Sequence, residues 1–296
     1  MNRLFRKIDH FMHPPKGEII MLHRVVSDGA KLSHNRQFDI SPANLQLMLQ
    51  QYRKHGYWFA SIDDVYDMQL SRKYTDYPFV CITLDDGYKD NLTEALPVFK
   101  QYDCPFCVYV ASGFPDYTAF LWWYMLEAYI MDNSEITLPS GNHLTCDTIE
   151  TKNKTFETLH SLISAHLNGD VRLWIAENMP FILPYEKGLI NRMALSEDQL
   201  CQLTAEPLCT IGAHTINHVF LSHLTKDEKI KEIQGSKSRL EQIINSPISH
   251  FSYPYGDFDA ECVDVVRKSG FHTAVMAWGG GVRSNSNIYA LPRIKK

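Results

Sequence analysis

Short apolar runs alternate with amphipathic stretches along most of this chain. The runs have the length and continuous hydrophobicity of strands that are buried on both faces. They lie at residues 18–25, 58–62, 79–84, 105–111, 209–213, 249–253 and 272–278, with a last short run within 288–294. Because strands that alternate with helices are typical of parallel sheets, the pattern predicts a mostly parallel α/β fold.

Capping signals mark where several of the intervening helices begin. Ser41-Pro42 precedes an amphipathic segment that ends at Gly56, and Ser61 with Asp64 resembles a capping pair. Thr225 and Glu228 form a capping-box pattern at the start of a long helix that runs to about Asn245.

The regular alternation stops between residues 113 and 208, so we expect an insertion there in an otherwise single domain spanning residues 1–296. Its most apolar stretch, Phe120 to Met131, is too short to cross a bilayer and contains Glu127. We interpret it as a buried or cleft-lining helix; an aromatic helix on a membrane surface is the alternative.

The sequence lacks both GxGxxG after the first strand and GxxxxGK[ST], which disfavours an open nucleotide-binding sheet. A barrel is therefore the better prediction, and in such barrels the chemistry lies at the carboxyl ends of the strands.

Composition excludes several classes of protein. The 296 residues are 45% hydrophobic and 21% charged, as in ordinary globular proteins, and the net charge of -5 gives no basic footprint for nucleic acid. The seven scattered cysteines suggest reduced core residues. Residues 1–17 show no secretory signal, so we expect a cytoplasmic protein, with peripheral membrane contact as the alternative.

Two predicted strands end in residues that suit a metal site. The run at 79–84 is followed by Asp85-Asp86-Gly87, and the run at 209–213 is followed by His214 and His218. Each pattern alone is compatible with an ordinary turn or with solvated histidines. Together, one Asp and two His make an open three-ligand site for zinc or a similar ion, and the second Asp is left to accept a proton from water.

These segments resemble the polysaccharide deacetylase family, also called the NodB homology domain or carbohydrate esterase family 4. Its first motif, [TS]-[FL]-D-D-G, matches Thr83 to Gly87, and its second, H-[ST]-x-x-H, matches His214 to His218. Its third, R-x-P-[YF], is matched in part by Ser252 to Tyr255. The resemblance implies a distorted (β/α)7 TIM-like barrel and metal-dependent removal of N-acetyl groups from sugars.

Carried over by position, the resemblance makes Asp85 the general base and Asp86, His214 and His218 the ligands of a divalent metal, most simply zinc. The backbone N–H of Tyr255 would donate to the oxyanion. Pro254 and Trp278 would lie at the substrate. Apart from the resemblance, Trp122 and its aromatic neighbours are expected either to pack over the barrel or to stack on sugar rings or contact a lipid carrier, and packing is favoured.

The sequence departs from the family pattern at two functional positions. Ser252 stands where the family has an arginine that restrains the base, so that restraint must come from elsewhere. The family's late Leu-x-His, which supplies the general acid, is Leu291-Pro292-Arg293 here. Because first and last strands are neighbours in a closed barrel, we expect His23 to enter the same mouth and act as the general acid. A buried histidine bonded to backbone is the alternative.

The expected substrate is an N-acetylated sugar in a polysaccharide or a precursor glycan, including a nucleotide- or lipid-linked one. Two other functions fit the same residues. One is hydrolysis of a non-sugar C–N bond, such as a cyclic amide or ureide. The other is a barrel that has lost catalysis and binds carbohydrate, which the missing arginine and late histidine would explain.

Overall fold

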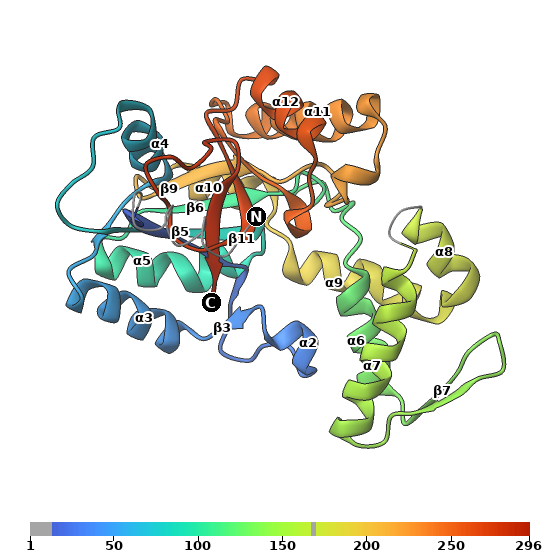
Figure 1. The fold of residues 1–296 in the computed structure, drawn as a ribbon. Coiled ribbons are helices and arrows are strands. Elements are labelled where there is room, and N and C mark those ends of the chain that lie inside the picture. Colours follow the sequence, from blue (N-terminus) through green and yellow to red (C-terminus); the bar gives the residue numbers. More distant parts are fainter. Residues whose placement is uncertain (1–13, 167–169) are drawn as a thin grey trace, which may run out of the picture.

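A closed barrel of seven parallel strands forms the centre of the computed structural model, which describes residues 14–166 and 170–296 (Figure 1). β1 pairs with both β12 and β5 and so closes the ring. Around the barrel the strands are β1 (Gly17–Leu22), β12 (Leu291–Lys295), β11 (Thr273–Gly279), β10 (His250–Ser252), β9 (Cys209–Ala213), β6 (Phe106–Val110) and β5 (Phe79–Asp86). The predicted (β/α)7 barrel is confirmed.

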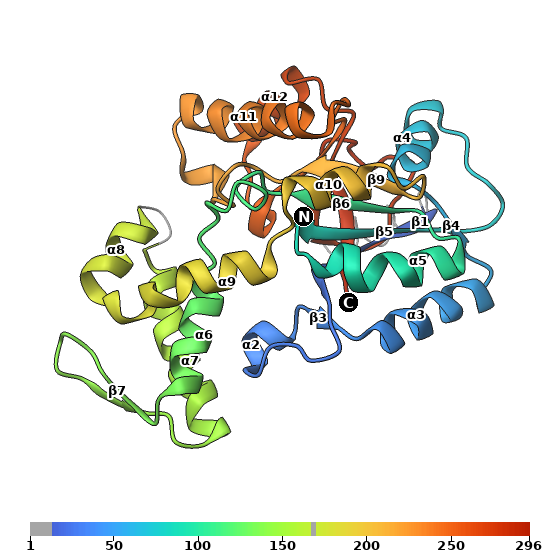
Figure 2. The same ribbon diagram turned by 180° about the vertical axis from the view of Figure 1, so that it is seen from behind.

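Helices pack around the outside of this barrel, with α3 and α5 on one side and α11 and α12 on another (Figures 1 and 2). The predicted caps are present: Ser41 accepts a hydrogen bond from the Asn44 N–H, and Thr225 and Glu228 form a capping box. The outer helices are α3 (Pro42–Lys54), α4 (Ile62–Ser71), α5 (Leu96–Tyr102), α10 (Glu197–Thr204), α11 (Lys226–Ile244) and α12 (Ala260–Lys268).

Several small elements refine the expected pattern. The run at 58–62 yields only the two-residue β4 (Trp58–Phe59), which pairs with the start of β5. The last strand begins at Leu291, later than expected. The remaining short elements are β2 (Arg24–Val25), β3 (Asp39–Ile40), α2 (Ser33–Arg36), the π-helical turn η1 (Asn91–Ala95), η3 (Leu221–His223) and η4 (Pro254–Gly256).

Most of the segment between β6 and β9, up to Met193, forms a lobe beside the barrel mouth, as both views show. It has its own apolar cluster, which includes Met125 and Leu126 of α6 and Phe156 of α7. Its elements are α6 (Trp122–Asp132), β7 (Glu135–Thr137), β8 (His143–Thr145), α7 (Ile149–Ser164), α8 (Val171–Asn178), η2 (Pro180–Tyr185) and α9 (Glu186–Met193). Among the described residues, none of the helices has both the length and the apolarity to span a membrane.

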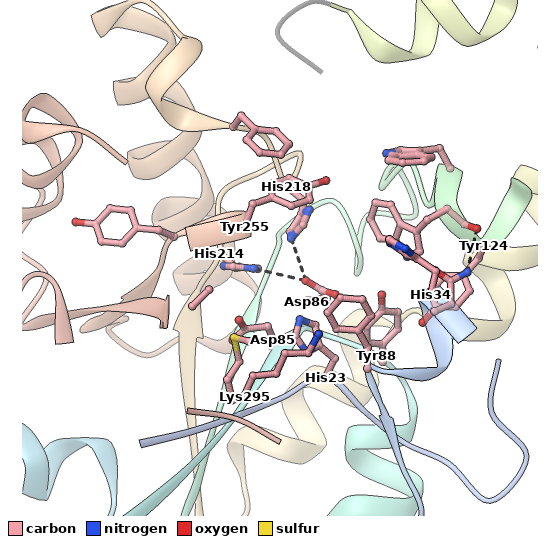
Figure 3. Close-up of a pocket in the computed structure, with 18 of the residues that line it drawn as sticks. His23, His34, Asp85, Asp86, Tyr88, Tyr124, His214, His218, Tyr255 and Lys295 are labelled. Atoms are coloured by element: carbon pink, nitrogen blue, oxygen red, sulfur yellow. Dashed lines mark hydrogen bonds and ion pairs between the residues drawn. The ribbon is translucent and has the colours of Figure 1, made fainter. Parts of the chain in front are cut away.

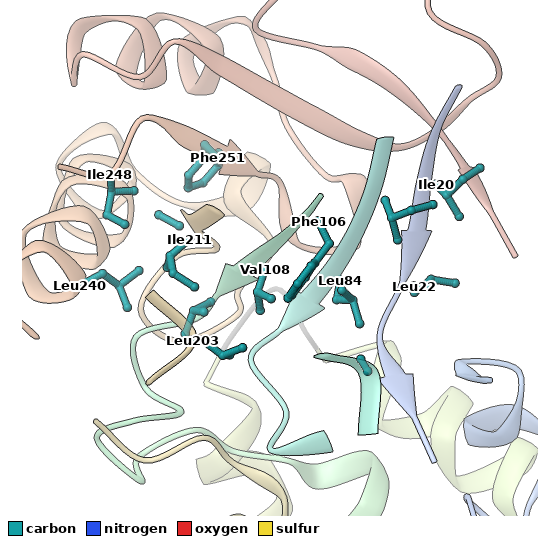
Figure 4. Packing of buried hydrophobic residues seen from close by; sticks show 14 of the residues in the cluster. Ile20, Leu22, Leu84, Phe106, Val108, Leu203, Ile211, Leu240, Ile248 and Phe251 are labelled. Atoms are coloured by element: carbon teal, nitrogen blue, oxygen red, sulfur yellow. The ribbon is translucent and has the colours of Figure 1, made fainter. Parts of the chain in front are cut away.

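Alternation along β5 separates two layers of side chains. Val80, Ile82 and Leu84 pack outward with residues of the surrounding helices and neighbouring strands (Figure 4). The intervening positions, which include Thr83 and Asp85, point into the barrel, since successive side chains of a strand face opposite sides. Asp85 is thereby placed at the carboxyl end of the barrel interior.

The structure bears on the expectation about the cysteines but not on the one about the N-terminus. The interpretation of residues 1–17 as lacking a secretory signal concerns mostly residues 1–13, which lie outside the described part of the chain. All seven cysteines are free thiols, and five of them are buried.

Candidate metal centre at the barrel mouth

Three predicted ligands, Asp86, His214 and His218, converge at the carboxyl ends of β5 and β9 (Figure 3). The Asp86 Oδ1 atom lies 3.5 Å from Nε2 of His214 and 3.2 Å from Nε2 of His218. One ligand atom from each residue falls within 4.8 Å of the other two. A tetrahedral ion bound by three side chains requires such a cluster and retains a fourth position for water or substrate.

The backbone around these residues is held in an uncommon conformation. Asp86, Thr215, His218 and Tyr255 all have positive φ, at 80°, 65°, 53° and 57°. Left-handed conformations are unfavourable for residues with a Cβ and persist where surrounding structure imposes them, often at functional sites. Four of the eight non-glycine residues with positive φ in the described chain belong to this one site.

The hydrogen bonds around the cluster leave ligand atoms of His214 and Asp86 free to bind a cation. His214 donates from Nδ1 to the Ser252 carbonyl at 2.7 Å, which leaves the lone pair of Nε2 facing Asp86. The Asp86 Oδ1 atom is buried without a hydrogen-bond donor in the described part of the chain. A buried carboxylate oxygen without a donor, beside two imidazole nitrogens, fits a divalent metal ion.

Asp85 is held by an arginine that the sequence analysis did not assign to the site. Arg293 of β12 donates from Nη1 and Nη2 to the two Asp85 carboxylate oxygens, at 2.7 and 2.6 Å. Nη2 also donates to the Ser252 hydroxyl at 3.0 Å. The arginine expected at position 252 is therefore replaced by a guanidinium that reaches the same carboxylate from another strand.

Both carboxyl groups are buried and remain in their charged form. Burial alone would raise the pKa of Asp85, but the charge and hydrogen bonds of Arg293, together with the charges of His214 and His23, outweigh burial and the pKa lies below its usual value. Burial acts in the same direction on Asp86, where His218 and His214 lower the pKa well below the usual range. Two adjacent carboxylates thus have separate partners: a permanent cation for Asp85 and two histidines, the candidate metal ligands, for Asp86.

His23 lies at the same mouth, directly after β1, and lines the cavity with Asp85 and Asp86. Its ring packs edge-on against Phe38, with centroids 4.8 Å apart. Burial lowers the pKa of His23, while the charges of Asp86 and Asp85 oppose this effect. A protonated His23 would therefore release its proton readily. The expectation that the first strand brings a histidine into the mouth agrees with this placement.

Tyr255 lies in the turn η4, directly after Pro254, and its ring centroid is 4.5 Å from that of His218. Its ring also stacks on Phe220 at 3.9 Å. Trp278 is 56% exposed and lines the cavity. A Cβ at Gly256 would overlap the Trp278 ring, so the indole lies against the turn that carries Tyr255. Pro254, the first residue of this turn, is buried.

The predicted helix over Phe120 to Met131 is present as α6, and Trp122, Trp123 and Tyr124 all line the cavity. Trp122 is buried, with 3% of its surface exposed. It belongs to the apolar cluster of the lobe and also forms part of the cavity wall. The cavity has a volume of about 500 Å³, within the usual range for small-molecule sites.

Comparison with known proteins assigns the class. The family model described as polysaccharide deacetylase matches residues 72–274, more than two thirds of the chain, so this chain belongs to the polysaccharide deacetylase family. His23 and Arg293 both lie outside the matched range.

Individual relatives agree with this assignment. YxkH of Bacillus subtilis (strain 168), described by name as a putative polysaccharide deacetylase, is 26% identical over 282 residues, covering 95% of this chain and 72% of that protein. The fold resembles the deacetylase PplD of Streptococcus pyogenes, with a TM-score of 0.64, 17% identity and coverage of 95% and 93%. It also resembles IcaB from Ammonifex degensii, with a TM-score of 0.64, 16% identity and coverage of 95% and 92%.

Proposed function

We propose that this protein is a metal-dependent N-deacetylase that hydrolyses the acetamide of an N-acetylated sugar and releases acetate. The observation that carries the proposal is the convergence of Asp86, His214 and His218 beside an Asp85 that is ion-paired to Arg293. This arrangement provides a three-ligand site and a separate base, which metal-assisted amide hydrolysis requires.

Asp86, His214 and His218 would hold the cation. A divalent ion at such a site supplies Lewis acidity, which polarises a carbonyl group and lowers the pKa of water. Zinc suits two imidazoles and one carboxylate, although other divalent ions accept the same ligands.

The remaining residues would move protons and stabilise charge. Asp85, kept ionised by Arg293, accepts the proton of the attacking water. The Tyr255 N–H donates to the oxyanion as the acetamide carbon becomes tetrahedral, a contribution of about 3–4 kcal/mol in comparable sites. Protonated His23 then gives its proton to the departing amine nitrogen.

Two alternatives remain distinct from this proposal. Hydrolysis of a non-sugar amide or ureide would use the same metal and base, but the aromatic walls of the cavity favour a sugar, whose ring faces pack on aromatic side chains. Loss of catalysis was suggested by the missing arginine and late histidine. Arg293 pairs with Asp85 and His23 lines the same cavity, and these two observations support an active enzyme.

The test is acetate release from a panel of N-acetylated sugars, glycosides and precursor glycans, measured with and without a chelator. We expect acetate and a free amino sugar from at least one member, loss of release with chelator, and recovery when zinc is restored. Asp86→Ala and His214→Ala should lose metal and activity together. Zinc binding without acetate from any member would favour the carbohydrate-binding alternative, and release from a cyclic amide alone would favour the ureide-type hydrolase.

A further inference from the structure

One side of the cavity over the metal centre is bounded where α2 meets the lobe. The Glu127 carboxylate of α6 accepts hydrogen bonds from the Lys31 N–H at 2.6 Å and from Asn35 Nδ2 at 2.7 Å. Both Asn35 and Glu127 are buried. Nearby, the rings of His34 and His160 face each other with centroids 4.0 Å apart. These contacts join α2 to α6 and α7.

A second side is closed between the lobe and the β9 and β10 loops. The Trp123 ring centroid lies 5.8 Å from that of His218, and Trp122 interacts with the Tyr255 phenol. A backbone hydrogen bond adds to this contact: the Ser112 N–H donates to the Thr215 carbonyl at 3.0 Å. The lobe therefore contacts the loop that carries two of the three metal ligands.

A third side is closed where the lobe returns to the barrel. The Lys89 N–H donates to the Met193 carbonyl at 2.7 Å, and the Leu195 N–H donates to the Gly87 carbonyl at 3.1 Å. Arg24 bridges the same region, since its guanidinium lies 5.6 Å from the Tyr88 ring centroid and 5.4 Å from that of Tyr124. The loop after β5 is thus fixed to the end of α9.

These contacts do not bound the remaining side of the cavity. That side is lined by Trp278 and Lys295, at the ends of β11 and β12. Trp278 is more than half exposed although it lines the cavity, and the six-membered ring of its indole lies against Gly256. Lys295 is exposed and lies over Phe38, at 3.8 Å from the ring centroid. Figure 3 shows Lys295 beside His23 and Asp85, while His34 and Tyr124 lie across the cavity.

An internal unit of a polysaccharide carries neighbours on two sides of its ring, so it needs a groove that is open at both ends. A terminal unit or a simple glycoside carries one. Resting on the proposed function, we infer that this enzyme deacetylates a terminal N-acetylated sugar, whose single attached group leaves the cavity over Trp278 and Lys295. Internal units of a polymer are excluded by the walls that the lobe forms with α2 and with the β9 and β10 loops.

The experiment uses the zinc-loaded protein and β-linked N-acetylglucosamine oligomers of one to six units, including the methyl glycoside of the single unit. Acetate is measured at completion, and the free amine is located by fragment-ion mass spectrometry. We expect at most one acetate per molecule at every length, with the amine at one chain end; release from the one-unit glycoside alone fits equally. Several acetates per oligomer, or an amine at an internal unit, would overturn this inference and leave the deacetylase proposal intact. No acetate from any oligomer or from the wider panel would instead overturn the proposed function, and this inference with it.

A wall variant provides an independent readout. Trp123→Ala removes the indole beside His218 and should allow a second, internal acetate to be released from the longer oligomers. Glu127→Gln weakens the attachment of α2 to α6 and should act in the same direction. Leu173→Ala, at an exposed position of α8, is the matched control and should keep the terminal pattern. An unchanged terminal pattern in both folded wall variants would contradict the role given to the walls.

Discussion

Arg293 and Asp85 form a bidentate ion pair inside the barrel, between the last strand and the strand that ends at the candidate metal site. The pair is buried, with 1% and 3% of the two residues exposed. The guanidinium also donates to Thr83 and to the Met276 carbonyl, so its orientation is fixed on several sides. A bidentate pair of this kind fixes the direction as well as the charge of the carboxylate.

Two replacements of Arg293 should separate its effect on the orientation of the Asp85 carboxylate from the effect of its positive charge. Arg293→Lys keeps a cation but loses the planar fork, so we expect kcat to fall about 10- to 100-fold with KM and zinc content little changed. Arg293→Met leaves Asp85 buried without its cation and should lower the free energy of unfolding by about 3–5 kcal/mol. Steady-state kinetics and urea denaturation measure the two effects. Normal kcat in Arg293→Lys would show that the fork does not position the base.

Asp85→Asn tests the base directly. The amide has the shape of the carboxylate but accepts no proton, so acetate release should fall by a factor of about 10²–10⁴. Zinc content, measured by metal analysis of the purified protein, should stay at the wild-type value because Asp86 and both histidines are unchanged. Intact turnover in this variant would refute the base assignment.

His23→Ala tests the general acid. Without the imidazole, the departing amine has no positioned proton donor, and acetate release should fall at least 100-fold while zinc content is retained. A reduction of only a few-fold with full zinc occupancy would mean that another group protonates the amine. The same measurement on His55→Ala, at an exposed position of the chain, provides the control.

His160 predicts a pH dependence of stability. Burial, together with the charge of His34, lowers its pKa to about 4, whereas an unfolded histidine titrates near 6.5. As the pH falls from about 6.5 to 4, the unfolded chain binds the proton first, so this residue makes the protein less stable with acidification. His160→Gln should therefore show a smaller fall in Tm between pH 7 and pH 5 than wild type. An identical fall in both proteins would contradict this placement of the ring, and His55→Gln serves as the control.

Much of the barrel and the residues of the candidate metal site were predictable because they depend on local patterns. An apolar run followed by Asp85-Asp86-Gly87 identifies a buried strand and its carboxyl end, and His214 follows another such run. The capping box of Thr225 and Glu228 likewise predicts the start of α11 from four consecutive residues. These features need no knowledge of distant contacts.

Arg293 was missed because its role depends on barrel closure. In the sequence, Leu291-Pro292-Arg293 shows only that a histidine is absent, and nothing local indicates that the side chain points inward to Asp85. The available signal was the combination of a missing arginine at position 252 and a basic residue on the last strand. The attachment of Glu127 to Asn35 was unpredictable for the same reason, since the two residues meet only in the folded chain.

The central claim is that Asp86, His214 and His218 bind one divalent cation beside Asp85. Diffraction from crystals grown with zinc, recorded at the zinc absorption edge, tests it most directly. The account predicts a single strong anomalous peak about 2.0–2.2 Å from one oxygen of Asp86 and one nitrogen of each histidine, absent in His218→Ala. A zinc peak elsewhere, with these three side chains turned away from one another, would contradict it.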